Sequence, residues 1–153
     1  MKITVEERKK MVEHLTATRP SKTPYYPETY QEYFKRAQIT EQMVKTRAGN
    51  SRVYIVRPQK LEQKFPVFIN VHGGGFVFGH SERDWYLSSK IAEQSGGIVV
   101  DVDYRTTESC MFPTPLYECY DIAKWVFENC ESWGADPTRI SMGGHSAGAT
   151  LTA

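Results

Sequence analysis

Ser146 lies near the end of the sequence, in the stretch GGHSAGATLTA, between Gly144 and Gly148 in the pattern Gly-x-Ser-x-Gly. The residues before it predict a buried strand and the residues after it predict a helix, and a serine on such a sharp strand-to-helix turn can serve as a nucleophile. The two glycines suit this turn because a side chain at either position would collide with neighbouring backbone. We therefore expect the Ser146 hydroxyl to point out of the carboxyl end of a sheet.

A second motif, His72-Gly73-Gly74-Gly75, follows directly on the apolar stretch FPVFINV. Consecutive glycines leave backbone N–H groups unobstructed, and a loop that brings such donors close to a reacting carbonyl is what an oxyanion hole requires. A glycine-rich loop after a strand can also cradle phosphate, but the G-x-x-x-x-G-K-[ST] and G-x-G-x-x-G patterns are both missing here. One motif supplies a nucleophile and the other supplies donors, so together they indicate acyl transfer.

The elements that must position these motifs alternate along the second part of the chain. Short apolar runs that suit strands buried on both faces are separated by helical patterns, which predicts βαβ units, a parallel sheet and the α/β class. The expected strands are 65–71, 96–104 and 139–144, and the expected helices are 83–95, 115–133 and a last one from Ala147.

The first part of the chain predicts a helical preface and a β-hairpin. Its expected elements are two amphipathic helices at 4–16 (behind Thr4 as N-cap) and 28–38, an extended proline-containing loop at 19–27, and antiparallel strands at about 41–47 and 52–57 around Gly49-Asn50. We therefore divide the chain into a helical cap segment, residues 1–40, and an α/β core, residues 41–153, that is truncated after the nucleophile turn.

The composition of the chain argues against several classes of binding partner. Over 153 residues the formal net charge is +1, which gives no field that would attract nucleic acid or an anionic membrane surface. We find neither a bilayer-spanning apolar run nor a cleavable leader, and we expect a cytoplasmic protein. Cys110, Cys119 and Cys130 are expected to be reduced thiols. No cluster of His, Cys, Asp and Glu has metal-ligand spacing, so no metal and no cofactor are expected.

Four successive blocks, HGGGFVFGH, DVDYR, FPTPLYECYDIAKWV and DPTRISMGGHSAGATL, together resemble the hormone-sensitive-lipase-like branch of the α/β-hydrolases. The resemblance runs from about residue 45 to the end, and the helical preface would correspond to the family's N-terminal cap. It implies the N-terminal half of an α/β-hydrolase fold, with a mostly parallel sheet. It also implies an esterase or lipase that acts on small-molecule esters of short to medium acyl chains through a serine acyl-enzyme.

The resemblance also implies roles for single residues. Ser146 would be the nucleophile, the backbone N–H groups of Gly74, Gly75 and Ala147 would form the oxyanion hole, and His72 would position the loop. One position and one four-residue segment depart from the family pattern. The residue before the nucleophile is usually Asp and is His145 here, and the usual Leu-Ala-Pro-Glu after Asp-Tyr-Arg is Thr-Thr-Glu-Ser at residues 106–109.

The triad acid and base of this fold follow the serine along the chain, and only AGATLTA follows Ser146. His14, His72 and His80 are expected to be structural or solvent-facing, and on a sharp turn the His145 side chain should diverge from that of Ser146. Since the base must reach the nucleophile, we expect the chain alone to be nearly inactive.

Three other interpretations stay open from the sequence. The scaffold also fits an amide or formamide hydrolase, because acyl chemistry is shared and a fold does not fix a substrate. A non-catalytic binding module could keep the pocket without the triad, and a fragment could have no function of its own. In each case the exposed edge of strand 139–144 is expected to find a partner, either a C-terminal half or a second copy of the chain.

Overall fold

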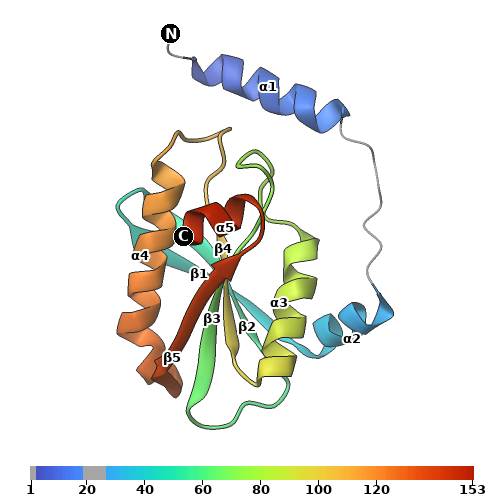
Figure 1. Cartoon of the computed structure of the whole chain (residues 1–153), viewed down its shortest axis with the longest axis vertical. Coiled ribbons are helices and arrows are strands. Elements are labelled where there is room, and N and C mark those ends of the chain that lie inside the picture. The colour runs from blue at the N-terminus through green and yellow to red at the C-terminus, as the bar shows by residue number, and fades with distance from the viewer. Residues whose placement is uncertain (1–2, 19–26) are drawn as a thin grey trace.

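A five-stranded sheet with the order β1-β2-β4-β3-β5 forms the centre of the molecule (Figure 1). The computed structural model describes residues 3–18 and 27–153. The strands are β1 (Gln38–Thr46), β2 (Gly49–Arg57), β3 (Phe65–Val71), β4 (Ile98–Asp103) and β5 (Ala135–Gly144). β3 pairs in parallel with both β4 and β5, whereas β2 pairs antiparallel with both β1 and β4. This mixed sheet confirms the predicted α/β class.

Helices cover both faces of this sheet. α3 (Glu82–Ser95) lies against one face beside α2 (Glu28–Arg36), and α4 (Thr114–Asn129) lies against the other (Figure 1). The chain continues from α4 through a 3₁₀ turn (Cys130–Trp133) into β5 and ends in α5 (Ala147–Thr152). In the part of the chain that the structure describes, no helix combines the length and the apolar character needed to span a bilayer.

The core explains the apolar runs of β3 and β4. Ile98, Val100 and Val102 join the larger cluster beneath α4, while Val99 faces the smaller cluster beneath α3 together with Ala92. Because successive side chains of a strand point to opposite faces, a strand covered on both sides must be apolar throughout. Burial on both faces therefore explains the continuous apolar runs from which these strands were predicted.

The hairpin is confirmed, but its turn lies two residues before the predicted Gly49-Asn50. Thr46 pairs with Gly49, so Arg47 and Ala48 form the turn. The Thr46 hydroxyl donates to the Gly49 carbonyl (2.8 Å) and accepts from the Ala48 N–H (3.3 Å), and these contacts close the loop at this point.

Two predicted helices extend too far. Helix 28–38 ends at Arg36, because Ala37 is extended and Gln38 already pairs with Arg57 in the sheet. Helix 115–133 ends as an α-helix at Asn129 and finishes in the 3₁₀ turn, which Gly134 closes in the left-handed conformation. In both cases contacts distant in sequence override the local helical pattern.

The first helix, α1 (Val5–Thr18), is loosely attached. It has no buried residue, and Figure 1 shows it apart from the sheet. Thr4 caps it as predicted, since its hydroxyl accepts from the Glu7 N–H (3.2 Å). The Arg8 guanidinium donates to the carbonyl of Cys110 (2.8 Å) in the loop after β4. The predicted loop 19–27 falls, apart from Pro27, outside the described residues, and the division at residue 40 stays a prediction.

Candidate active site

Ser146 sits on the turn between β5 and α5 in a strained conformation. Its φ is 53° and its ψ is −122°, a region that residues other than glycine rarely adopt. A Cβ at Gly144 would lie 2.4 Å from the Val71 carbonyl oxygen, and one at Gly148 would lie 2.0 Å from the same atom. Both glycines are therefore required by the close approach of this turn to the end of β3, and the Ser146 side chain is left exposed.

The loop after β3 turns through left-handed conformations at Gly74 (φ 132°), Gly75 (φ 62°) and Phe76 (φ 63°). The N–H groups of Val77 and Phe78 both donate to the Gly74 carbonyl, at 3.0 and 2.9 Å. Within the described residues, the N–H groups of Gly74 and Gly75 donate to no protein acceptor. These two donors are therefore free for a ligand.

The two loops meet at the carboxyl ends of neighbouring strands. Val71 of β3 pairs with Gly144 of β5, and the Gly73 N–H donates to Nε2 of His145 (3.3 Å). The N–H of Ala147, at the start of α5, likewise has no acceptor in the described part of the chain. The fold therefore brings the serine turn and the glycine loop together at one edge of the sheet, with unpaired donors on both.

His72 is a buried packing residue at the start of the glycine loop. Its ring stacks on Tyr104 with the centroids 4.2 Å apart, and its Nδ1 donates to the Gly73 carbonyl (2.6 Å). The Tyr104 hydroxyl donates to the His72 carbonyl (3.0 Å). Burial lowers the pKa of His72 below its usual value and raises that of Tyr104. These contacts are what a neutral, loop-positioning side chain would make.

None of the histidines acts on Ser146 in this structure. His14 is exposed on α1, and His80 pairs with Asp101. His145 faces the glycine loop through its contact with Gly73. Across the described residues, no imidazole or carboxylate hydrogen-bonds the Ser146 hydroxyl.

Comparison with known proteins is consistent with this geometry. A family model described as alpha/beta hydrolase fold matches residues 68–153. This chain belongs to the α/β-hydrolase family. The predicted resemblance to the hormone-sensitive-lipase-like esterases is confirmed at the level of the family.

Individual relatives are esterases by name. Versiconal hemiacetal acetate esterase of Dothistroma septosporum is 36% identical over 100 residues, which is 65% of this chain and 30% of that protein. Carboxylesterase NlhH of Mycobacterium tuberculosis is 32% identical over 101 residues, 66% of this chain and 32% of the relative. The solved structure of an esterase from Pyrobaculum calidifontis superposes with a TM-score of 0.72 at 28% identity, covering 98% of this chain and 46% of the other. The chain therefore spans less than half the length of these relatives.

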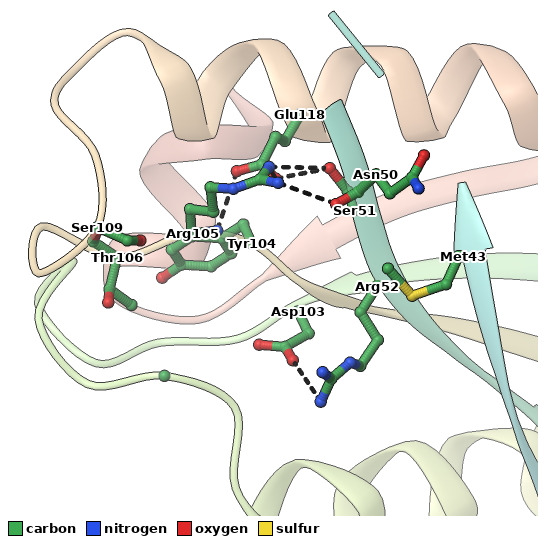
Figure 2. A pocket seen from close by; sticks show the side chains of 11 residues that line it. Met43, Asn50, Ser51, Arg52, Asp103, Tyr104, Arg105, Thr106, Ser109 and Glu118 are labelled. Atoms are coloured by element: carbon green, nitrogen blue, oxygen red, sulfur yellow. Dashed lines mark hydrogen bonds and ion pairs between the residues drawn. The ribbon is translucent and has the colours of Figure 1, made fainter. Parts of the chain in front are cut away.

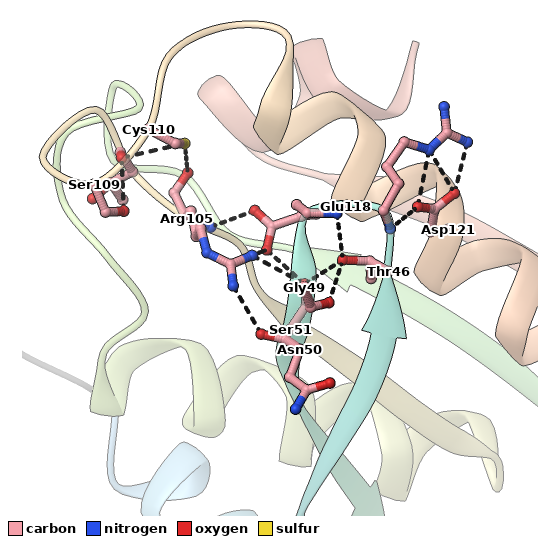
Figure 3. A network of polar contacts seen from close by, with 12 residues as sticks. Thr46, Gly49, Asn50, Ser51, Arg105, Ser109, Cys110, Glu118 and Asp121 are labelled. Atoms are coloured by element: carbon pink, nitrogen blue, oxygen red, sulfur yellow. Dashed lines mark hydrogen bonds and ion pairs between the residues drawn. The ribbon is translucent and has the colours of Figure 1, made fainter.

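A buried ionic network holds the next loop of this α/β-hydrolase, the one after β4 (Figure 3). The Glu118 carboxylate, on α4, is fully buried and accepts from the Arg105 backbone N–H (2.9 Å) and the Ser51 hydroxyl (2.6 Å). The Arg105 guanidinium pairs with the same carboxylate and also donates to the Asn50 carbonyl (2.9 Å). Hairpin, loop and helix are thereby joined through one buried carboxylate.

The same residues line a polar pocket of about 300 Å³ (Figure 2). Its cationic side chains are already paired, Arg105 with Glu118 and Arg52 with Asp103 (3.8 Å). Ser146 is not part of its lining. The pocket therefore has no unpaired charge for a ligand, and its side chains are better explained as supports for the loop.

The sequence-based prediction missed the two carboxylates that are fully buried, Asp101 and Glu118. Both left a signal in the sequence. Asp101 interrupts the apolar run IVVDVD, and Glu118 shares a helix face with Ile122 and Val126. A fully buried acidic residue needs a partner, so both positions pointed to buried pairs. Within the described residues, no group of three or more His, Cys, Asp or Glu is placed to hold a metal ion.

Proposed function

We propose that this chain carries the nucleophile and the oxyanion hole of a carboxylic ester hydrolase. The observation that carries the proposal is the exposed, strained Ser146 beside a loop whose Gly74 and Gly75 N–H groups have no protein acceptor. The esterase names of the relatives support the substrate class. The proposed substrates are small-molecule esters, and a cytoplasmic location stays a prediction.

The proposed reaction has two steps. The Ser146 Oγ attacks the ester carbonyl carbon while a base takes its proton, and the oxygen of the tetrahedral intermediate accepts hydrogen bonds from the N–H groups of Gly74, Gly75 and Ala147. The intermediate collapses with loss of the alcohol, which takes up a proton, and water then hydrolyses the acyl-enzyme.

The described residues contribute no base to this reaction. Without one, a serine hydrolase keeps only the residual catalysis of the oxyanion hole and of binding. We therefore propose that the chain alone has very low turnover and that the acid and the base come from additional polypeptide. β5 ends the strand order, so we infer that its outer edge pairs with another strand. A C-terminal half would supply the acid and the base as well, whereas a second copy would only cover the edge. The molar mass in solution separates these two partners.

Labelling by an aryl phosphonate tests the role of Ser146. The reagent phosphonylates nucleophilic serines with loss of its phenol, and its tetrahedral product places an oxygen in the oxyanion hole. Because the described residues supply no base, we expect slow formation of an adduct on Ser146 that depends on the oxyanion hole, identified by intact mass and peptide mapping, and no adduct in Ser146→Ala. Thr150→Ala, which removes an exposed hydroxyl one turn along α5, is the matched control and should be labelled like the wild type. Equal labelling of Ser146→Ala and the wild type would contradict the proposal.

A further inference from the structure

The far end of the glycine loop is held by a buried ion pair. His80 Nε2 lies 2.9 Å from Oδ2 of Asp101, and the two side chains are 4% and 0% exposed. Asp101 lies in β4, and its other oxygen accepts from the Asn70 amide (2.8 Å) of β3. Both carboxylate oxygens are thus satisfied, and the imidazole is tied to the middle of the sheet.

Aromatic rings fix the orientation of His80. Its ring contacts Tyr54 of β2 (centroids 4.7 Å apart) and Trp85 of α3 (5.7 Å), and it stands perpendicular to the His72 ring (5.8 Å). The two imidazoles at the ends of loop 72–80 therefore contact each other. One stacks on Tyr104 just after β4, and the other pairs with Asp101 inside β4.

Between these two ends, Gly74 and Gly75 have no side chain that could anchor them. Glycines lose more backbone freedom on ordering than other residues, and Gly74 and Gly75 carry the free donors. The segment is closed by the bonds from Val77 and Phe78 to Gly74, and the N–H and hydroxyl of Thr107 both donate to the Phe76 carbonyl (2.8 and 3.1 Å). The Phe76 ring packs against the core, and the Gly73 N–H donates to His145. The conformation of the glycines therefore depends on the anchors at both ends.

We propose that His80 and Asp101 are positioning residues for the oxyanion hole, which fix the end of loop 72–80 to β4 and so hold the Gly74 and Gly75 N–H groups in place. That these N–H groups form an oxyanion hole rests on the proposed esterase function. That His80 and Asp101 anchor the loop does not depend on that function.

The charges around His80 favour this role. Burial alone would lower the pKa of His80, but the hydrogen bond to Asp101 and the negative charges of Asp101, Asp84 and Asp103 raise it above its usual value. Asp84 faces it from α3 and the other two from β4, while Tyr54 and His72 are the titratable neighbours on β2 and the loop. The pair is therefore charge-assisted over part of the range near neutral pH.

Amide hydrogen exchange at Val77 and Phe78 tests the anchoring directly. Loss of a charge-assisted bond should raise the loop-opening equilibrium, and hence the exchange of these amides, by about 10- to 100-fold in Asp101→Asn and His80→Leu. His80→Gln retains a donor near the Nε2 position and should restore part of the protection, which a space-filling role would not explain. Asp121→Asn makes the same chemical change in an ion pair between α4 and the hairpin turn, and should leave these amides unchanged.

Two results would overturn the inference: equal exchange in Asp101→Asn and the wild type, or equal acceleration in Asp121→Asn. Asp101→Asn keeps the shape of the side chain, so it decides the matter even where His80→Leu does not fold. Phosphonylation of Ser146 adds the chemical readout and should slow by about tenfold in Asp101→Asn, less than the 10²- to 10³-fold cost of removing a whole oxyanion donor. A wild-type protein that is not labelled would contradict the proposed function alone, because the exchange measurement would still test the anchor.

Discussion

The glycine loop after β3 and the serine turn after β5 follow neighbouring parallel strands, yet they are held in different ways. Side chains anchor the two ends of the glycine loop, His72 at one end and His80 at the other, and backbone bonds to Gly74 close the loop between them. Backbone contact holds the serine turn, where Gly144 and Gly148 allow an approach to Val71 that any Cβ would block. Substitutions can weaken a side-chain anchor by different amounts, and an anchor that contains histidine responds to pH. A close backbone approach is instead blocked by the addition of a single Cβ atom.

Gly148→Ala should produce the largest effect. The added Cβ would lie 2.0 Å from the Val71 carbonyl oxygen and 2.6 Å from that of His72, and neither oxygen can move without disturbing the end of β3. We expect the free energy of unfolding to fall by about 3 kcal/mol or more, as measured by urea denaturation.

The control for this variant is Gly79→Ala, in the glycine loop. A Cβ at Gly79 meets nothing within 4 Å, so its free energy of unfolding should stay within about 0.5 kcal/mol of the wild type. Equal destabilisation by both variants would show that the serine turn does not depend on close backbone approach.

Asp101→Asn should have a smaller effect that depends on pH. A folded-state pKa of His80 above its usual value of 6.5 stabilises the fold fully below pH 6.5, and this contribution is lost as the pH rises through the folded pKa. We expect the variant to lose about 2 kcal/mol near pH 6, and its difference from the wild type to shrink at higher pH. Urea denaturation at a series of pH values measures this difference.

His72 titrates in the opposite sense, since its lowered pKa contributes stability that is lost as the pH falls. Burial is the largest cause of this lowered pKa and is the same in wild type and variant, so that part cancels in their difference; the smaller effects of the Asp101 and His80 charges on His72 do not. The destabilisation by Gly148→Ala should not change over the same pH range, because neither glycine nor alanine has a side chain that titrates. If the destabilisation by Asp101→Asn did not change with pH, the glycine loop would not differ from the serine turn in having a titrating anchor.

Tyr104→Phe should have the smallest of the three effects. The variant keeps the ring that stacks on His72 and removes the hydroxyl that donates to the His72 carbonyl. We expect a loss of about 1 kcal/mol in the free energy of unfolding, measured by thermal denaturation. Tyr120→Phe, at an exposed position on α4, should leave the stability unchanged; a comparable loss there would point to a general effect of removing tyrosine hydroxyls.

The same distinction explains how much could be predicted from the sequence. The serine turn and the glycine loop could be predicted because each is a short motif. Its glycines lie next to, or themselves carry, the hydroxyl or N–H groups that stay available for a ligand. Strand β3 was predicted with its observed bounds, since burial on both faces leaves a continuous apolar run. The hairpin turn was misplaced because Thr46 and Ser51, which are buried polar residues, fix the register through the network around Glu118.

The anchor of the glycine loop could not be predicted in the same way. His80 and Asp101 lie in different elements, and only the sheet brings them together. The expectation for His80 left open a structural or a solvent-facing position, and a side chain that is 4% exposed decides for the structural one. Pairing between distant residues depends on the topology, which local patterns do not specify.

The order of strands also has a consequence for how the site forms during folding. β1 and β2 pair across a two-residue turn, but Val71 and Gly144 pair across the longest stretch of chain in the described sheet. Contacts between distant residues carry the largest loop-closure entropy and slow folding most. The serine and its oxyanion donors therefore become neighbours through the slowest kind of contact that the sheet makes. We expect the hairpin to form early, and the site to assemble only when β5 docks against β3.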